Sequence, residues 1–315
     1  MSMLWTSNEG YLASPKLSDH LMTKVQPMTR FRQFGEIEEA IGKNRGEKFN
    51  WTVFGDLKDQ GGRLSEDNPI PETEFDADNA SVVITEWGLS VPYTGKLNDL
   101  SEKPVTQIIN KQLKNDCKKV LDTGAWEAFE RSPVRMVGQP NGEVITYRTG
   151  KPEIINDSPL SIDHIQTIVD DLEESNVPPI DDDGNYVCIA RPKTFRPFRK
   201  EWEKLSTYVS EGYTRIINGE KGRYEGVRFV SQTNIPNAKW KNGKSDRAYF
   251  IGADAVAEAV AIPEEIRGKI PDDYGRGHGI AWYALLEFAL CHPAANDARV
   301  YVWDSLETPV QPGDS

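Results

Sequence analysis

Residues 46–75 read GEKFNWTVFGDLKDQGGRLSEDNPIPETEF, and they set the architecture expected of the whole chain. The segment begins like a strand, because Phe49, Trp51 and Val53 alternate with other residues on a period of two. Charged residues, glycine and proline follow, until a second β-rich run at residues 81–85. Two such runs around a turn-rich segment predict a β-hairpin with a long loop. Because an isolated two-stranded ribbon is marginally stable in water, this hairpin is expected to need a partner surface.

The predicted loop is strongly acidic. Residues 56–78 carry eight carboxylates against Lys58 and Arg63, a net charge of −6. The preceding arm, residues 1–35, has the opposite sign, with four basic and two acidic residues. Its apolar residues Leu21, Val25, Met28 and Phe31 predict a helical stretch that Pro27 would interrupt. Such charge runs indicate solvated segments.

The strongest helix signal lies in residues 101–131. Ser101 is expected to be the N-cap, Pro104 to be tolerated in the first turn, and Ser132-Pro133 to end the helix. A helix of this length spans about 40 Å. Its apolar stripe consists of Val105, Ile108, Ile109, Gln112, Leu113, Cys117, Val120, Leu121, Ala125 and Phe129.

The remaining sequence alternates between strand and helix patterns, which predicts an α+β fold. A helix is expected to start at Ser161, a second to carry Phe195, Phe198 and Trp202, and a third to cover residues 253–261. The expected strands are residues 144–148, 186–190, 227–230, 248–251, 280–290 and 299–303, the last two joined by a turn at His292-Pro293.

Composition excludes several classes of protein. With 315 residues and a formal net charge of −12, the chain is too large for one small module and too acidic to bind nucleic acid through a broad basic face. The amino terminus lacks the pattern of a secretory signal, and the longest apolar run, residues 279–291, is too short to span a bilayer. Cys117, Cys188 and Cys291 are far apart and are expected to be buried, reduced thiols.

Two loops invite a ligand-binding interpretation. Asp181-Asp182-Asp183-Gly184 suggests calcium, but Pro192 occupies the twelfth position, where a calcium loop has glutamate, so a polar turn is favoured. Residues 275–279, GRGHG, suggest a phosphate cradle, but a strand-like run follows them in place of a helix. A flexible connector is therefore expected there.

No catalytic constellation emerges from the titratable residues. His20, His164, His278 and His292 lie outside nucleophile and zinc-protease patterns, and surface or capping roles are expected, with His164 facing off the apolar stripe of its helix. The carboxylates of Asp170, Asp171, Glu173 and Glu174 resemble a solvated helix face. We therefore assign no catalytic, cofactor-binding or metal-binding residue.

The order of these parts resembles the major capsid proteins of tailed bacteriophages, which share the Hong Kong 97-like fold. The resemblance covers nearly the whole chain, and each matching segment is weak alone, while their collinear order is specific. The matching segments are residues 28–35 (MTRFRQFG), 41–51 (IGKNRGEKFNW), 84–94 (ITEWGLSVPYT), 222–229 (GRYEGVRF) and 248–260 (AYFIGADAVAEAV).

The resemblance implies a division of the chain. It implies an amino-terminal arm at residues 1–45, an extended hairpin (E-loop) at 46–85, a peripheral domain at 86–135 and 256–294 containing the spine helix 101–131, and an axial domain at 136–255 and 295–315. The E-loop would lie on a neighbouring subunit, and attraction between the basic arm and the acidic loop would then weaken with salt.

The function implied is that of a structural protein and not an enzyme. Copies would form the hexamers and pentamers of an icosahedral phage head, assembled in the host cytoplasm around double-stranded DNA that is held without sequence-specific contact. A separate scaffolding protein, a portal and possible decoration proteins are the expected partners, without a membrane. No lysine–asparagine cross-link pattern can be aligned, so a noncovalent shell is expected. The alternatives are an encapsulin-like compartment and a soluble hydrolase using His278 or the Asp181 loop.

Overall fold

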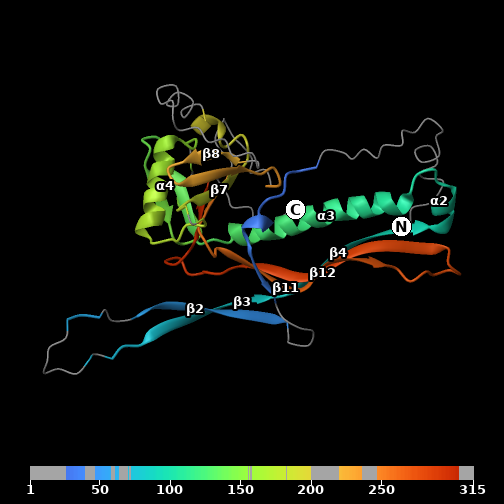
Figure 1. Cartoon of the computed structure of the whole chain (residues 1–315). Coiled ribbons are helices and arrows are strands. Elements are labelled where there is room, and N and C mark those ends of the chain that lie inside the picture. The colour runs from blue at the N-terminus through green and yellow to red at the C-terminus, as the bar shows by residue number, and fades with distance from the viewer. Residues whose placement is uncertain are drawn as a thin grey trace.

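The computed structural model of the chain contains two β-sheets, a projecting hairpin and one dominant helix (Figure 1). The residues it describes are 26–39, 47–57, 61–63, 70, 72–154, 156, 158–181, 183–199, 220–235 and 247–304. Most of the arm and the tip of the acidic loop lie outside these ranges, including His20, Leu21, Val25 and Lys58, and so does Trp202. Residues 26–31 of the predicted helical stretch are described and are not helical, and the short 3-10 helix η1 (Arg32–Phe34) follows them.

The first sheet has four strands in the order β1-β11-β12-β4. Its strands are β1 (Glu36–Glu39), β11 (Val256–Gly268), β12 (Gly277–Leu290) and β4 (Thr85–Thr94). The two long strands β11 and β12 are antiparallel, β4 pairs antiparallel with β12, and the short β1 runs parallel to β11. Segments from the start, middle and end of the sequence therefore meet in one sheet.

The second sheet has seven strands in the order β6-β5-β13-β10-β7-β9-β8. Its strands are β6 (Val144–Tyr147), β5 (Val134–Gly138), β13 (Val300–Trp303), β10 (Ala248–Ile251), β7 (Tyr186–Ala190), β9 (Val227–Ser231) and β8 (Glu220–Tyr224). Helix α4 (Ile162–Glu174) packs against one face of this sheet, where Ile165, Ile168 and Leu172 are fully buried. The five central strands are mostly apolar, and all their residues except Arg228 of β9 are buried, as expected for a sheet covered on both faces.

Helix α3 (Val105–Glu130) lies along the four-stranded sheet (Figure 1). It starts three residues later than predicted, with Pro104 as the N-cap residue in place of Ser101, because Pro104 disfavours helical backbone at Lys103. Ser101 instead ends a short helix that was not predicted, α2 (Gly95–Leu100). The end of α3 at Arg131 agrees with the predicted stop at Ser132-Pro133.

The buried stripe of α3 winds around the helix. The stripe recurs every four residues through Val105, Ile109, Leu113, Cys117, Leu121, Ala125 and Phe129. Four residues turn an α-helix about 40° past a full turn, so six such steps rotate the buried direction by roughly 240°. The amino-terminal part therefore faces the four-stranded sheet, and the carboxyl-terminal part is enclosed by both sheets. Gln112, which was predicted to belong to the stripe, falls beside it and is exposed.

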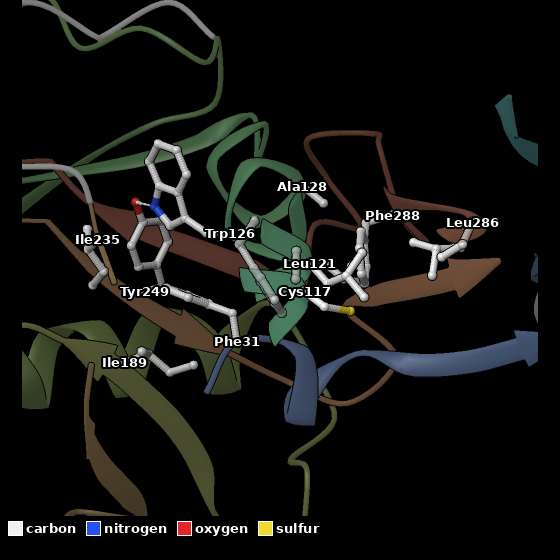
Figure 2. Packing of buried hydrophobic residues seen from close by; sticks show 14 of the residues in the cluster. Phe31, Cys117, Leu121, Trp126, Ala128, Ile189, Ile235, Tyr249, Leu286 and Phe288 are labelled. Atoms are coloured by element: carbon white, nitrogen blue, oxygen red, sulfur yellow. Dashed lines mark hydrogen bonds between the residues drawn. The ribbon is translucent and has the colours of Figure 1, made fainter. Parts of the chain in front are cut away.

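The enclosed end of α3 forms the joint between the two sheets. Figure 2 shows Trp126 of α3 against Tyr249 of β10, with the indole Nε1 donating to the tyrosine hydroxyl at 2.6 Å. Phe31 of the arm packs edge-on against Tyr249, and Phe288 of β12 lies in the same cluster. On the sheet side, Gly124 allows a close approach, since a β-carbon there would lie 3.1 Å from the Trp87 ring. One continuous core therefore connects the sheets.

Strands β2 (Lys48–Leu57) and β3 (Phe75–Val83) form the predicted antiparallel hairpin. In the described residues it is a two-stranded sheet of its own, and it projects from the body on the side of the four-stranded sheet opposite α3 (Figure 1). A single residue, Ile84, separates β3 from β4, and its amide donates to the carbonyl of Glu47 at 2.8 Å.

Three parts of the body differ from the sequence-based predictions. Residues 253–261 were predicted to be a helix, but Val256 begins β11, because pairing with β1 and β12 outweighs the helix propensity of its alanines. The strands around residues 280–290 and 299–303 are present, but they belong to different sheets. Strands β1, β4, β5 and β8 were not predicted.

Candidate functional site: the projecting hairpin and the arm

The base of the hairpin packs on the body through one face. Phe49, Trp51 and Val53 are partly buried, whereas the residues between them are exposed, so the period-two prediction is confirmed. The Trp51 indole donates to the carbonyl of Cys291 at 3.4 Å, just beyond the end of β12. Opposite Trp51, Ala80 of β3 is 5% exposed. This face of the hairpin therefore packs on the body of its own subunit.

The outer half of the hairpin exposes large apolar side chains. The exposed fractions are 71% for Phe54, 55% for Leu57, 70% for Ile70 and 61% for Phe75. The rings of Phe54 and Phe75 lie 6.2 Å apart and form a pair across the two strands. Exposed apolar residues gathered in this way mark an interaction surface. We call Phe54, Leu57 and Phe75, which the strand pairing brings together, the hairpin patch.

The hairpin patch involves the opposite face of the ribbon from the base contact. Side chains alternate along a strand, so Phe54 points away from the side of Trp51, and Phe75 away from that of Ala80. One face of the ribbon therefore packs on the body at the base, and the opposite face carries Phe54 and Phe75 farther out. Sequence reasoning treated this region as a polar loop and missed the patch, although Phe54 and Phe75 already flanked it in the sequence.

The arm segment, residues 26–39, is anchored on the body by backbone and side-chain hydrogen bonds. The amide of Met28 donates to Thr233 Oγ1 at 2.7 Å, and the amide of Asn234 donates to the Met28 carbonyl at 3.3 Å. The amide of Phe31 donates to Asp122 Oδ1 at 2.7 Å. Burial raises the pKa of Asp122, although Gln232 and Asn234 also donate to its carboxylate.

Arg32 joins the arm to two carboxylates of β11. Its guanidinium donates to Glu258, which is fully buried, at 2.7 to 3.1 Å, and to the partly exposed Glu264 at 2.9 and 3.0 Å. These hydrogen bonds lower the pKa of the Glu264 carboxyl. The next residues of the arm form β1, so the arm docks in a defined register.

A second buried charge cluster lies where α3 meets the seven-stranded sheet. Glu130 accepts from Arg135 at 3.0 Å, from Tyr249 at 2.6 Å and from Arg247. Asp304 lies 3.8 Å from Arg135 and 3.7 Å from Arg247. The carboxylates and guanidiniums are paired with each other, which is the condition for keeping charges in a core. This cluster fixes the joint between α3 and the seven-stranded sheet.

The residues considered for chemistry do not converge. His164 was wrongly expected to face off its apolar stripe: it is 3% exposed, because its ring caps α4 through Ser161 and bonds the Gln139 carbonyl at 2.8 Å. The capping role was correctly predicted. His278 lies in β12 and stacks on Tyr93, while burial lowers the pKa of His292.

The two candidate ligand loops are engaged within the protein. Asp181 pairs with Arg228, and Asp183 lies 3.5 Å from Arg223. The predicted connector at residues 275–279 is only partly a loop, because β12 begins at Gly277. Among the described residues, no group of histidine, cysteine and carboxylate side chains could hold a metal ion, and no helix could span a membrane.

The other sequence-based expectations concern cysteines and helix charges. Cys117, Cys188 and Cys291 are buried, free thiols, as predicted. On α4, Asp170, Glu173 and Glu174 are exposed. Asp171 is partly buried and accepts from Thr146 at 2.7 Å, so it links α4 to β6.

Comparisons with known proteins connect this architecture to solved structures. No protein-family model and no curated protein matches the sequence. The capsid asymmetric unit of cyanophage Pam1 matches with a TM-score of 0.69 at 16% identity, over 94% of this chain and 97% of that one. The capsid of Ralstonia phage GP4 matches with a TM-score of 0.69 at 14% identity, over 96% of this chain and 97% of that one.

A third match is the head structure of Helicobacter pylori bacteriophage KHP40, with a TM-score of 0.63 at 10% identity over 96% of each chain. These matches span both sheets, α3 and the hairpin. The chain therefore has the Hong Kong 97-like capsid fold, and the predicted α+β class is confirmed.

Proposed function

We propose that this chain is the major capsid protein of a tailed bacteriophage, which assembles into the hexamers and pentamers of an icosahedral head enclosing double-stranded DNA. The observation that carries the proposal is the capsid fold over more than nine-tenths of the chain, combined with a hairpin whose outer half exposes Phe54 and Phe75. The proposed role is structural, and the interfaces between subunits would supply the free energy that stabilises the shell. Assembly would take place in the host cytoplasm, and the product would be the virion capsid.

The elements divide between two proposed domains. The four-stranded sheet and α3 would form the peripheral domain, and the seven-stranded sheet with α4 the axial domain. Residues 86–135 and 256–294 supply most of the first, and residues 136–255 and 295–315 most of the second. A portal, a scaffolding protein and possible decoration proteins are proposed as further partners.

The hairpin patch is the proposed contact between subunits. Phe54 and Phe75 would be buried on a neighbouring copy, because their face is turned away from the contact that the base makes with its own subunit. Each phenylalanine buried in this way contributes about 1.5–3 kcal/mol. The combined contribution of the two phenylalanines is large for one contact, and each hairpin of a shell would make the same contact.

The experiment compares assembly of three forms of the chain. Purified protein is examined by size-exclusion chromatography and negative-stain electron microscopy as the wild type, as Phe54→Ser/Phe75→Ser and as Phe54→Leu/Phe75→Leu. Wild type and the leucine variant should form shells. The serine variant should need at least about a hundredfold higher protein concentration, while its unfolding transition stays unchanged. A wild type that stays monomeric at high concentration would overturn the proposal.

A further inference from the structure

A basic surface lies on α3, although the chain as a whole is acidic. Residues 103–119 contain five lysines and one aspartate, a net charge of +4, within a chain of net charge −12. Lys111, Lys114 and Lys118 follow the spacing i, i+3, i+7 and share one side of the helix, with Lys119 next to them. All four are exposed. We call them the lysine stripe.

The lysine stripe is turned away from the four-stranded sheet. The sheet lies against the opposite side of α3, where Leu113 and Cys117 are buried. The single carboxylate in this stretch, Asp116, is directed at the sheet and accepts from the Trp282 indole at 3.0 Å. Asp116 therefore faces the sheet and not the lysine stripe.

The other side of the sheet has a different charge pattern. Side chains alternate along β12, so Tyr283 lies on the side opposite Trp282, and Glu86 and Glu265 occupy neighbouring strands there. Tyr283 donates to Glu86 at 3.1 Å. Arg267, a cation on this side, donates to Glu265 at 2.6 Å and lies 3.7 Å from the centre of the Tyr283 ring. Helix and sheet therefore form a layer with a basic side and an acid-bearing side.

The position of the hairpin indicates which side meets neighbouring copies. The hairpin leaves the body on the side of the sheet away from α3 (Figure 1). In a closed shell the subunits are related by rotations about axes that cross the shell, so every copy presents the same side outward. A hairpin on the sheet side thus meets a neighbour on its sheet side, and the described residues of the hairpin would not cover the lysine stripe.

We propose that the lysine stripe lies on the inner surface of the head and contacts the phosphates of packaged double-stranded DNA. This inference rests on the proposed function and assigns its inner face. Ammonium groups bind phosphates without reading sequence and release counterions as they do so. The contact is confined to one helix. A chain that is acidic as a whole can therefore bind DNA through this small basic surface, without a broad basic face.

Chemical labelling of lysines tests the contact in assembled heads. DNA-filled heads and heads emptied of DNA are treated with a small amine-acylating reagent, and the rate of modification at each lysine is followed by mass spectrometry. Lys111, Lys114, Lys118 and Lys119 should react several-fold more slowly in filled heads. Lys48 of the hairpin and Lys269 beyond β11 are internal controls and should react equally in both.

Each other outcome contradicts the inference in a different way. Equal rates for the stripe in filled and empty heads would overturn the DNA contact and leave the proposed function intact. Protection by DNA at Lys48 and Lys269 instead would invert the assignment of faces. Protection of the stripe only in DNA-free precursor shells would assign it to an internal protein. Failure to form heads at all would overturn the proposed function, and this inference with it.

Discussion

Arg32 and Glu258 form an ion pair that ties the arm to the four-stranded sheet. Glu258 is fully buried, and its carboxylate accepts hydrogen bonds from both Nε and Nη2 of the guanidinium. The two residues are 226 positions apart in the sequence. The position of the arm is therefore defined by one of the few charges that the sheet buries.

Replacing Arg32 by methionine should destabilise the subunit strongly. The substitution keeps the apolar stem but leaves Glu258 buried without its partner, which typically costs about 3–5 kcal/mol. Urea unfolding of unassembled subunits measures the loss. The matched control, Glu264→Gln, removes the partly exposed partner and should cost less than about 1 kcal/mol. If both variants lost the same free energy of unfolding, the burial of Glu258 would not be the reason for the contribution of the ion pair to stability.

The second ion pair of Arg32, with Glu264, should make the stability of the subunit sensitive to acid. Arg32 lowers the pKa of Glu264 below its ordinary value of 4.5. The resulting stabilisation is fully present above that ordinary value and is lost as the pH falls through the lowered pKa of the folded state. Free energies of unfolding measured from about pH 6 to pH 3 should therefore fall less steeply in Glu264→Gln than in wild type. In an Arg32→Met background, Glu264→Gln should not change the slope.

Replacing Asp122 by alanine should loosen the arm segment. The amide of Phe31 and the side-chain amides of Gln232 and Asn234 would lose their acceptor, at a cost of about 1–3 kcal/mol. Hydrogen exchange of residues 28–34 should accelerate. Asp116→Ala, six residues earlier in α3, removes only the bond from Trp282 and is the control that should leave this exchange unchanged.

Gly138→Ala should disrupt the seven-stranded sheet. A β-carbon at this position would lie 2.1 Å from the Trp303 ring, which is completely buried, and overpacking of this kind typically costs about 1–3 kcal/mol. The near-ultraviolet circular dichroism of the tryptophan should change. Gly268→Ala places its β-carbon in open space and should be neutral. If the contact is the cause, Trp303→Leu should cost less in the alanine background than in wild type.

The assembled shell should dissociate into single chains in denaturant. No lysine–asparagine pattern for a covalent bond could be aligned in the sequence. Denaturing electrophoresis of purified particles should show one band near the chain mass of 35.4 kDa. A ladder of multiples would demonstrate cross-linking, and peptide mapping would then locate the bond.

The parts that the sequence predicted well have strong local periodicity. The hairpin followed from alternation around Trp51, and α4 followed from Ser161 and a clean apolar stripe. Helix α3 was also found, because its apolar residues recur over seven turns. In these elements the local pattern and the tertiary packing favour the same structure.

The parts that were missed depend on contacts between distant segments. Residues 256–261 carry helix-forming alanines, and only pairing with β1 and β12 makes them a strand. The burial of His164 depends on Gln139 and Trp303. The lysine stripe was not predicted either. The sheet covers one side of α3 and leaves the lysines on the other side exposed, and the sequence alone does not show which side is covered.

Ile84 gives the hairpin a one-residue pivot. The dihedral angles of this residue set the inclination of the ribbon relative to β4, and the hydrogen bond from Ile84 to Glu47 lies beside it. Fivefold and sixfold rings require different inclinations between adjacent copies. In the proposed head, small rotations at this pivot, accommodated by the contact of Trp51 with Cys291, would supply that difference while both sheets keep their internal geometry, so that one polypeptide would occupy both kinds of position.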